Sequence, residues 1–431
     1  MTINTQEKDC IVFIGAGQAA IQASDTLRAE GFKGRITIIG DEACLPYQRP
    51  QLSKDLLAQE DTSVLPLRAE NFFTQHAIDL RLGRRAVAVD SAARTVELDD
   101  GEKVDYSQLV FATGSRPRKL TIPGGGSDKV REVRTVEQAL QLRADMRKDA
   151  KVVIVGGGFI GLEVAAQANN CGADVTLLPG KRNLMSRSVS PAMSKWFETL
   201  HADSGTKIRC GETAVAFHET GDPGAGEPVI VESDSGAKYP ADIIVVGIGS
   251  IPNDALAHET GLIVDEGVVV NSCLQASLAN TWAIGDCACF PREIGEDLVR
   301  LESVQNATDQ GRLVARNIIN ALSGQALSEY REVPWFWSNQ ATARLQIAGL
   351  RQKTDSTCVT LGDPQNGKFS ILCFNSVGNL SAVESVNSPG IHMAARKLLN
   401  SSIPLTVEEA LEPDFCLKAA SKKHSQLISV A

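Results

Sequence analysis

Several features are scarce in this 431-residue sequence, and each absence excludes a class of protein. No stretch approaches the roughly 20 apolar residues that a membrane span needs. The N-terminal residues 1–10 are polar and lack the apolar segment of a secretory signal peptide, so we expect a cytoplasmic protein. Lys and Arg number 43 against 52 Asp and Glu, and the resulting net charge of −9 argues against nucleic-acid binding.

The ten cysteines include no C-x-x-C pair, and their closest spacing is the C-x-C of Cys287 and Cys289. That pattern suits neither an iron–sulfur cluster nor a structural zinc site, so we predict no metal centre. Buried, reduced thiols are the simpler interpretation.

A glycine-rich unit near the N-terminus organises the rest of the chain. An apolar run at 10–14 leads into GAGQAA (residues 15–20), then a helical stretch and a second apolar run at 35–39 that ends at Asp41 and Glu42. In such a unit the first glycine permits a sharp turn, the second lets a pyrophosphate approach the backbone, and the third small residue lets the helix pack closely. The helix N-terminus attracts phosphate, and the terminal acid holds ribose hydroxyls. We predict dinucleotide binding here.

A second unit of this kind follows about 140 residues later, over 151–182. It has a full GGGFIG turn at 156–161, but Pro179 stands where the terminal acid belongs, and Lys181 and Arg182 follow. A carboxylate at that place favours NADH, whereas basic side chains accept the 2′-phosphate of NADPH. The two basic residues are equally consistent with solvated loop charges. Two such units in one chain suggest two nucleotides in contact.

Eight motifs in order resemble one family over nearly the whole chain, the FAD-dependent ferredoxin reductases of bacterial oxygenase systems, in the glutathione-reductase-like superfamily. These reductases serve Rieske dioxygenases and some cytochromes P450. The motifs are GAGQAA, PYQRPQLSK, FATGSRP, GGGFIGLE, GIGSIPN, AIGDCACFP, ESVQNATDQG and VPWFWSNQ.

The resemblance implies an α/β chain with two Rossmann-like dinucleotide-binding domains and a C-terminal α+β domain that covers the flavin. FAD would bind the first unit and NADH, with NADPH as the alternative, the second. The implied boundaries are 1–117 and 248–329 for the two segments of the FAD-binding domain, 118–247 for the NAD(P)H-binding domain, and 330–431 for the C-terminal domain.

Motif matching also implies roles for single residues. Lys54 would lie at the isoalloxazine, where its charge would stabilise the reduced flavin, and Glu163 would lie near Lys54 and the nicotinamide. Asp286 would bind the ribityl chain, and Trp335 or Trp337 would lie near the flavin, where an iron–sulfur partner docks. The expected cofactor-binding residues are Gly15, Gly17, Ala19, Ala20, Asp41, Glu42, Arg49, Lys54, Thr113, Gly114, Arg116, Gly156, Gly158, Phe159, Ile160, Gly161, Lys181, Arg182, Gly249, Asp286, Ser303, Val304 and Trp335.

The sequence departs from the family pattern at four positions. The family usually has glutamate at Pro179 and a second proline at Gln51. It commonly has aspartate at Asn339 and a bulkier residue near Ala341.

The expected activity is hydride transfer from NAD(P)H to FAD, followed by single-electron transfer to a [2Fe–2S] ferredoxin, with rubredoxin less favoured. Such partners are usually acidic, so a local basic patch is expected. A disulfide reductase is disfavoured, because Cys44 is the single cysteine in the loop after the first unit. The alternatives are an NAD(P)H oxidase or apoptosis-inducing-factor-like flavoprotein that uses oxygen or a quinone, and a nucleotide-dependent redox sensor. Monomer and homodimer both stay open.

Overall fold

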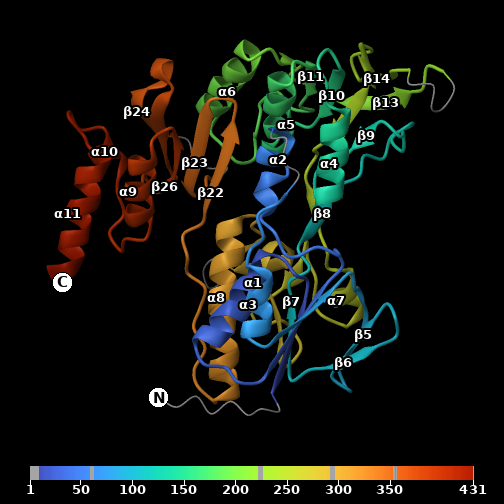
Figure 1. Ribbon diagram of the computed structural model, residues 1–431. Coiled ribbons are helices and arrows are strands. Elements are labelled where there is room, and N and C mark those ends of the chain that lie inside the picture. The colour runs from blue at the N-terminus through green and yellow to red at the C-terminus, as the bar shows by residue number, and fades with distance from the viewer. Residues whose placement is uncertain are drawn as a thin grey trace. The chain divides into compact units, whose positions relative to one another are not determined.

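The structure is a computed structural model that describes residues 9–58, 63–221, 227–291, 297–352, 355 and 357–430 (Figure 1). Residues 1–8, on which part of the signal-peptide argument rests, lie outside this description. The chain divides into two compact units. Unit 1 comprises residues 1–48, 64–116 and 250–332, and unit 2 comprises residues 49–63, 117–249 and 333–431.

Unit 1 is built on a five-stranded parallel sheet with the order β19-β7-β1-β2-β3. Its three inner strands read as nearly continuous apolar runs, as expected where both faces of a parallel sheet are covered. The strands are β1 (Cys10–Ile14), β2 (Arg35–Gly40), β3 (Ile78–Leu82), β7 (Gln108–Phe111) and β19 (Thr281–Ala283).

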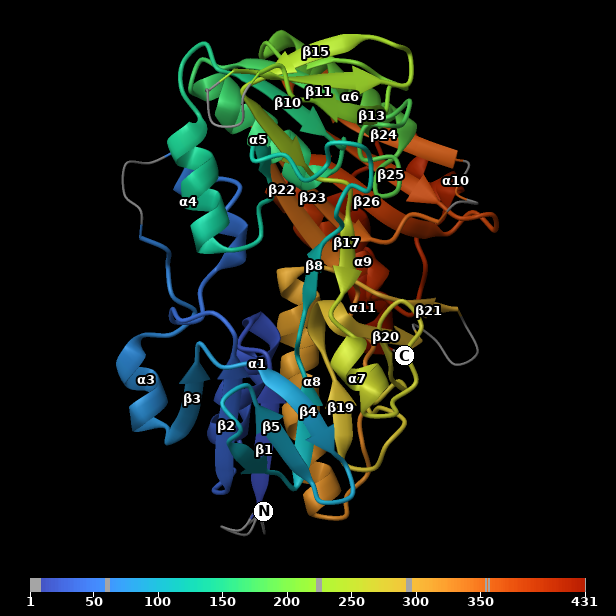
Figure 2. The ribbon, with the colours of Figure 1, turned by 90° about the vertical axis from the view of Figure 1, so that its right-hand side faces the viewer.

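Two long helices of unit 1, α1 (Gln18–Ala29) and α8 (Val304–Leu322), lie side by side in both views (Figures 1 and 2). Small residues allow this close approach. A Cβ added to Gly311 of α8 would lie 2.6 Å from the carbonyl oxygen of Ala19 in α1. The buried Ala19 and Ala20 therefore belong to a tight helix pair beneath the first glycine turn.

Shorter elements complete unit 1 around this sheet. Two small sheets join β4 (Ala86–Asp90), β5 (Thr95–Leu98) and β6 (Lys103–Asp105), and β18 (Val268–Val269), β20 (Ala288–Pro291) and β21 (Leu298–Val299). The short helices are α3 (Glu70–Gln75) and α7 (Ala255–Glu259), and β8 (Ser115–Pro117) pairs with β17 (Ser250–Pro252).

Unit 2 repeats the architecture in a parallel sheet with the order β12-β11-β10-β16-β9. Its strands are β9 (Val130–Arg131), β10 (Lys151–Val155), β11 (Asp174–Leu178), β12 (Lys207–Ile208) and β16 (Ile243–Val246). Its helices are α2 (Asp55–Ala58), α4 (Val136–Asp145), α5 (Phe159–Asn170) and α6 (Pro191–Asp203), and a small antiparallel sheet joins β13 (Ala214–His218), β14 (Val229–Ser233) and β15 (Lys238–Ala241).

The C-terminal part of unit 2 is a five-stranded antiparallel sheet with the order β22-β23-β26-β25-β24 (Figure 2). The predicted fold class, two Rossmann-like parallel sheets and a C-terminal α+β part, is confirmed. The elements are β22 (Trp335–Gln340), β23 (Ala343–Gly349), β24 (Thr357–Asp363), β25 (Lys368–Phe374), β26 (Leu380–Val386), α9 (Pro389–Leu399), α10 (Val407–Ala410) and α11 (Leu417–Val430).

A buried carboxyl group joins two parts of unit 2. Glu384 of β26 is 0% exposed and accepts hydrogen bonds from Ser190, the N-cap residue of α6, through the backbone N–H at 2.6 Å and the hydroxyl at 2.7 Å. Burial raises the pKa of Glu384 to about 7, although the Ser190 hydrogen bonds oppose the shift.

We expect replacement of Glu384 by glutamine to remove part of the pH dependence of stability. The folded-state pKa is raised above the ordinary glutamate pKa of about 4.3, so the contribution of Glu384 is fully present below that value. This contribution to the free energy of unfolding, on the order of 3 kcal/mol, is lost as pH rises through the folded-state pKa of about 7. Thermal unfolding of the holoprotein at several pH values should show that the stability of Glu384→Gln relative to wild type increases as pH rises. The exposed control Glu408→Gln should show no such increase. Parallel curves would contradict this.

Candidate functional site

The first glycine of each glycine-rich turn occupies a position that only glycine tolerates. Gly15 has φ of +111°, and a Cβ there would lie 2.1 Å from the carbonyl oxygen of Ala112. Gly156 repeats this geometry, with φ of +115° and a Cβ position 2.2 Å from the carbonyl oxygen of Gly247. Both turns therefore place backbone against the neighbouring strand end.

The second glycine of each turn leaves open space. Gly17 and Gly158 are the N-cap residues of α1 and α5, and neither helix has a side-chain cap. A Cβ on Gly17 would meet no atom within 4 Å, and one on Gly158 would meet only the carbonyl oxygen of Gly247, at 4.0 Å. An uncapped helix N-terminus with open space before it suits an anionic pyrophosphate, so both turns fit a dinucleotide.

The third small residue differs between the units. A Cβ on Gly161 would lie 2.3 Å from the carbonyl oxygen of Gly156, whereas the buried Ala20 accommodates a methyl group.

In unit 1, side chains after three further parallel strands gather at the same sheet edge as the GAGQAA turn. Asp41 and Glu42 follow β2, and the Tyr47 hydroxyl donates a 2.7 Å hydrogen bond to the Glu42 carboxylate. After β7, Thr113 donates to the carbonyl oxygen of Asn253 at 2.6 Å. Parallel sheets bind ligands at this edge, where the strand order reverses.

The end of β19 brings Asp286 to that edge. The Ser115 hydroxyl donates to the Asp286 carboxylate at 3.2 Å, and Arg300 donates to the Asp286 carbonyl oxygen at 3.1 Å. Ser303 caps α8, and its hydroxyl accepts a 3.0 Å bond from the backbone N–H of Asn306.

The remaining predicted residues of unit 1 have local structural roles. The Ser303 side chain serves as the helix cap, and Val304 is the first residue of α8. Gly114 has φ of +67°. Arg116 donates to the Asn253 side chain at 2.9 Å.

In unit 2, a buried carboxylate accepts hydrogen bonds from three donors on two segments that are far apart in the sequence. Glu163 of α5 is 2% exposed and accepts from Lys54 Nζ at 2.7 Å, Ser53 Oγ at 2.5 Å and Ser338 Oγ at 2.6 Å. The Lys54 side chain is itself 12% exposed. A lysine on the open surface, or an acid that only complements a helix end, would not be buried to this degree. We call these four residues the Glu163 cluster.

A hydrogen-bond chain leads inward from the Glu163 cluster. Gln340 Nε2 donates to Ser338 Oγ at 3.0 Å, and Gln340 Oε1 lies 3.0 Å from His201 Nε2. His201 is fully buried, and burial lowers its pKa. The sequence analysis missed Ser53, Ser338 and Gln340, although the first lies in PYQRPQLSK and the other two in VPWFWSNQ, so the motifs could have found them.

Other predicted residues of unit 2 lie around these features. Arg49 donates to the carbonyl oxygen of Arg134 at 2.7 Å. Phe159 packs against Phe336 with 4.4 Å between ring centroids, and Ile160 is 44% exposed at the start of α5.

Trp335 belongs to an aromatic cluster in the C-terminal part. Its ring centroid lies 5.6 Å from that of Trp337 and 5.7 Å from that of the buried His392, and the Arg396 guanidinium lies 4.6 Å above it. Burial, with Arg396 and Arg344 nearby, lowers the pKa of His392 to about 4. Arg396 therefore supplies the positive charge of this cluster at neutral pH.

The strand ends of unit 2 differ in charge from those of unit 1. Pro179 follows β11 and is buried, whereas Lys181 and Arg182 are exposed. Gly249, after β16, has φ of +107°, and the Arg187 guanidinium lies 3.7 Å from where its Cβ would stand.

The predicted residues thus fall into two groups, one in each unit. Unit 1 holds Gly15, Gly17, Ala19, Ala20, Asp41, Glu42, Thr113, Gly114, Arg116, Asp286, Ser303 and Val304. Unit 2 holds Arg49, Lys54, Gly156, Gly158, Phe159, Ile160, Gly161, Glu163, Lys181, Arg182, Gly249 and Trp335.

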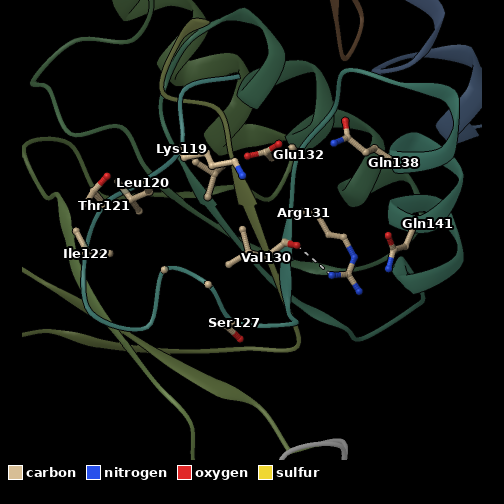
Figure 3. A pocket seen from close by; sticks show the side chains of 13 residues that line it. Lys119, Leu120, Thr121, Ile122, Ser127, Val130, Arg131, Glu132, Gln138 and Gln141 are labelled. Atoms are coloured by element: carbon tan, nitrogen blue, oxygen red, sulfur yellow. Dashed lines mark hydrogen bonds between the residues drawn. The ribbon is translucent and has the colours of Figure 1, made fainter. Parts of the chain in front are cut away.

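A separate hollow of about 570 Å³ lies in unit 2 beside the end of β16 (Figure 3). Lys119, Glu132 and Gln138 line it, and the Arg131 guanidinium beside it donates to Asp145 at 2.6 Å. None of its lining residues belongs to the predicted site. Over the described ranges, no three His, Cys, Asp or Glu side chains form a metal-binding group, and no helix is long and apolar enough to cross a membrane.

Comparisons with known proteins cover nearly the whole chain. Residues 9–311 match the family model described as pyridine nucleotide-disulphide oxidoreductase, and residues 335–421 match the one described as reductase C-terminal. Rhodocoxin reductase of Rhodococcus erythropolis is 44% identical over 96% of this chain and 95% of its own length.

Solved structures with more than 30% identity share the fold, as two examples show. The ferredoxin reductase for the CYP199A2 system of Rhodopseudomonas palustris has a TM-score of 0.90 and 37% identity, covering 96% of this chain and all of that one. The reductase in the covalent putidaredoxin reductase–putidaredoxin complex has a TM-score of 0.88 and 33% identity, covering 97% of this chain and all of that one.

Proposed function

Because this chain belongs to the FAD-dependent ferredoxin reductases of oxygenase systems, we propose that unit 1 binds FAD, unit 2 binds NAD(P)H, and a [2Fe–2S] ferredoxin receives the electrons. The enzyme is a ferredoxin–NAD(P)⁺ reductase. The observation that carries the proposal is the pair of matched, uncapped glycine turns at Gly17 and Gly158. The turn at Gly17 would hold FAD, which would supply the chemistry that links a hydride donor to a one-electron acceptor.

The chain's own residues would then position the reactants. Glu163 holds the Lys54 ammonium in a buried place, where a fixed positive charge acts more strongly than in water. Asp286 and Glu42 offer carboxylates to hydroxyl groups at the sheet edge of unit 1. We assign Lys54 and Glu163 the catalytic role and the glycine turns the binding role.

The nucleotide preference follows from charges at the end of β11. No carboxylate follows this strand, and the acid that lies beside Gly180, Glu212, accepts from Ser233 at 2.7 Å and Tyr239 at 2.8 Å. These hydrogen bonds, that of Ser233 foremost, lower the pKa of Glu212. Its carboxylate is therefore committed to protein donors. We infer that NADH binds without an acid at this position and that NADPH is also accepted, through the exposed Lys181 and Arg182.

The test is a Lys181→Ala/Arg182→Ala double variant, assayed with both nucleotides. The KM for NADPH should rise about 10-fold because the 2′-phosphate loses its counter-charges, while the KM for NADH changes little. NADH is the internal control. If the two KM values move together, the basic pair has no phosphate-binding role.

The ferredoxin partner is tested with the purified holoenzyme and a [2Fe–2S] ferredoxin. Ferredoxin reduction should be much faster than oxygen consumption in its absence. Fast oxygen consumption without ferredoxin would instead indicate an oxidase. Cytoplasmic location stays a prediction.

A further inference from the structure

Two cysteines of the C-terminal sheet lie directly opposite each other on neighbouring strands. Cys358 of β24 pairs in register with Cys373 of β25, and their sulfur atoms are 3.5 Å apart. Opposite residues of an antiparallel pair have Cα atoms about 4.5–5.5 Å apart, which lies inside the range that a disulfide spans. The two strands therefore already hold both thiols at bridging distance.

The two thiols differ in their access to solvent. Strand β24 is at the edge of its sheet, and Cys358 is exposed, whereas Cys373 is fully buried on the inner strand. A reagent in solution therefore reaches Cys358 first. Cys373 has no exposed surface.

The thiols also differ in acidity. The hydrogen bond between the two thiols, assisted by the positive charge of Arg351 and opposed by burial and Asp355, lowers the pKa of Cys358 to about 7. The same hydrogen bond and burial, with the negative charge of Glu384, raise the pKa of Cys373. A large fraction of Cys358 is thus thiolate near neutral pH, and the thiolate is the nucleophilic form of cysteine.

We propose that Cys358 and Cys373 form a reversible dithiol–disulfide site whose substrate is a hydroperoxide, with Cys358 as the attacking thiol and Cys373 as the resolving thiol. This site is separate from the nucleotide-binding turns and from the Glu163 cluster.

The proposed reaction has two steps. The Cys358 thiolate attacks the O–O bond of the hydroperoxide, so that an S–O bond forms, the O–O bond breaks, and the departing alkoxide or hydroxide takes up a proton. The Cys373 sulfur then attacks the Cys358 sulfur, so that the S–S bond forms, the S–O bond breaks, and water leaves with the Cys373 proton. In sum, two thiols and one hydroperoxide give a disulfide, an alcohol or water, and a second water. The protein loses two electrons to the hydroperoxide.

The test uses the full-length holoprotein and hydrogen peroxide. Before oxidation, iodoacetamide near neutral pH should alkylate Cys358 at least about 10-fold faster than Cys210, which is also exposed but whose pKa is raised by burial. After a small molar excess of peroxide and quenching, peptide mass spectrometry should find Cys358 and Cys373 joined by a disulfide that dithiothreitol reverses.

Variants assign the two roles. Cys373→Ser should leave Cys358 as a sulfenic acid that dimedone traps, Cys358→Ser should leave Cys373 reduced, and Cys210→Ser should behave as wild type. FAD content, measured by absorbance, confirms that each variant is folded. The proposal is overturned if peroxide leaves both thiols alkylatable in the wild-type protein, or if Cys358 reacts no faster than Cys210.

Discussion

Exchange of Glu163 for alanine is expected to slow flavin reduction by NAD(P)H about 100-fold while the FAD content stays at the wild-type level. The change removes the common acceptor of Ser53, Lys54 and Ser338. It also leaves the ammonium of Lys54, which is only 12% exposed, without this counter-ion, so the lysine is free to leave its position. Anaerobic stopped-flow absorbance at the flavin band measures the rate.

Two further variants separate the reasons for this loss. Glu163→Gln keeps the size of the side chain and an acceptor for Ser338, but it removes the charge that holds Lys54. A large effect of the glutamine variant therefore assigns the loss to the ion pair. Glu198→Ala, a change at a more exposed acid of α6 that pairs with Lys195, is the matched control. A wild-type reduction rate in Glu163→Ala would refute the catalytic assignment.

Placing a valine at the second glycine of each turn, one turn at a time, should show which turn binds FAD and which binds NAD(P)H. Gly17→Val has room in the protein itself, because a Cβ there meets no atom within 4 Å, but its side chain fills the space proposed for the FAD pyrophosphate. We expect a folded, colourless protein with at least 100-fold less activity. Gly158→Val should remain yellow, and its KM for NAD(P)H should rise at least about 10-fold.

Each of these variants is the control for the other. Flavin content by absorbance, circular dichroism and KM are measured on both proteins. A yellow Gly17→Val protein, or a colourless Gly158→Val protein, would reverse or remove the assignment of FAD to unit 1. Gly15→Val is unsuitable for this purpose, because its Cβ would lie 2.1 Å from a backbone carbonyl and the fold itself would suffer.

The predicted family and activity are confirmed by the comparisons, and the residues show why the sequence was sufficient. Gly15 and Gly156 have positive φ and lie against a neighbouring strand end. Only glycine meets both requirements, so the residue type itself marks these positions in the sequence. Continuous apolar runs identify strands that are covered on both faces. These are local constraints, and each is recorded within a few consecutive residues.

Long-range contacts cannot be read from a few consecutive residues. The family resemblance predicted that Glu163 lies near Lys54, but nothing in the local sequence showed that Ser53 and Ser338 share the same carboxylate. The donors come from two segments far apart in the chain, and the acceptor comes from a third. Serine also occurs too often on surfaces for its residue type alone to indicate a buried hydrogen bond.

The cysteines and Glu384 show the same limit. Spacing alone suggested buried, reduced thiols, yet strand register sets Cys358 opposite Cys373. Likewise, only the packing of β26 against the start of α6 buries Glu384 and shifts its pKa. The sequence by itself determined the two glycine-rich turns, because their backbone requirements are local. Tertiary structure decided the acid, serine and thiol partners, because burial and contact depend on residues far apart in the chain.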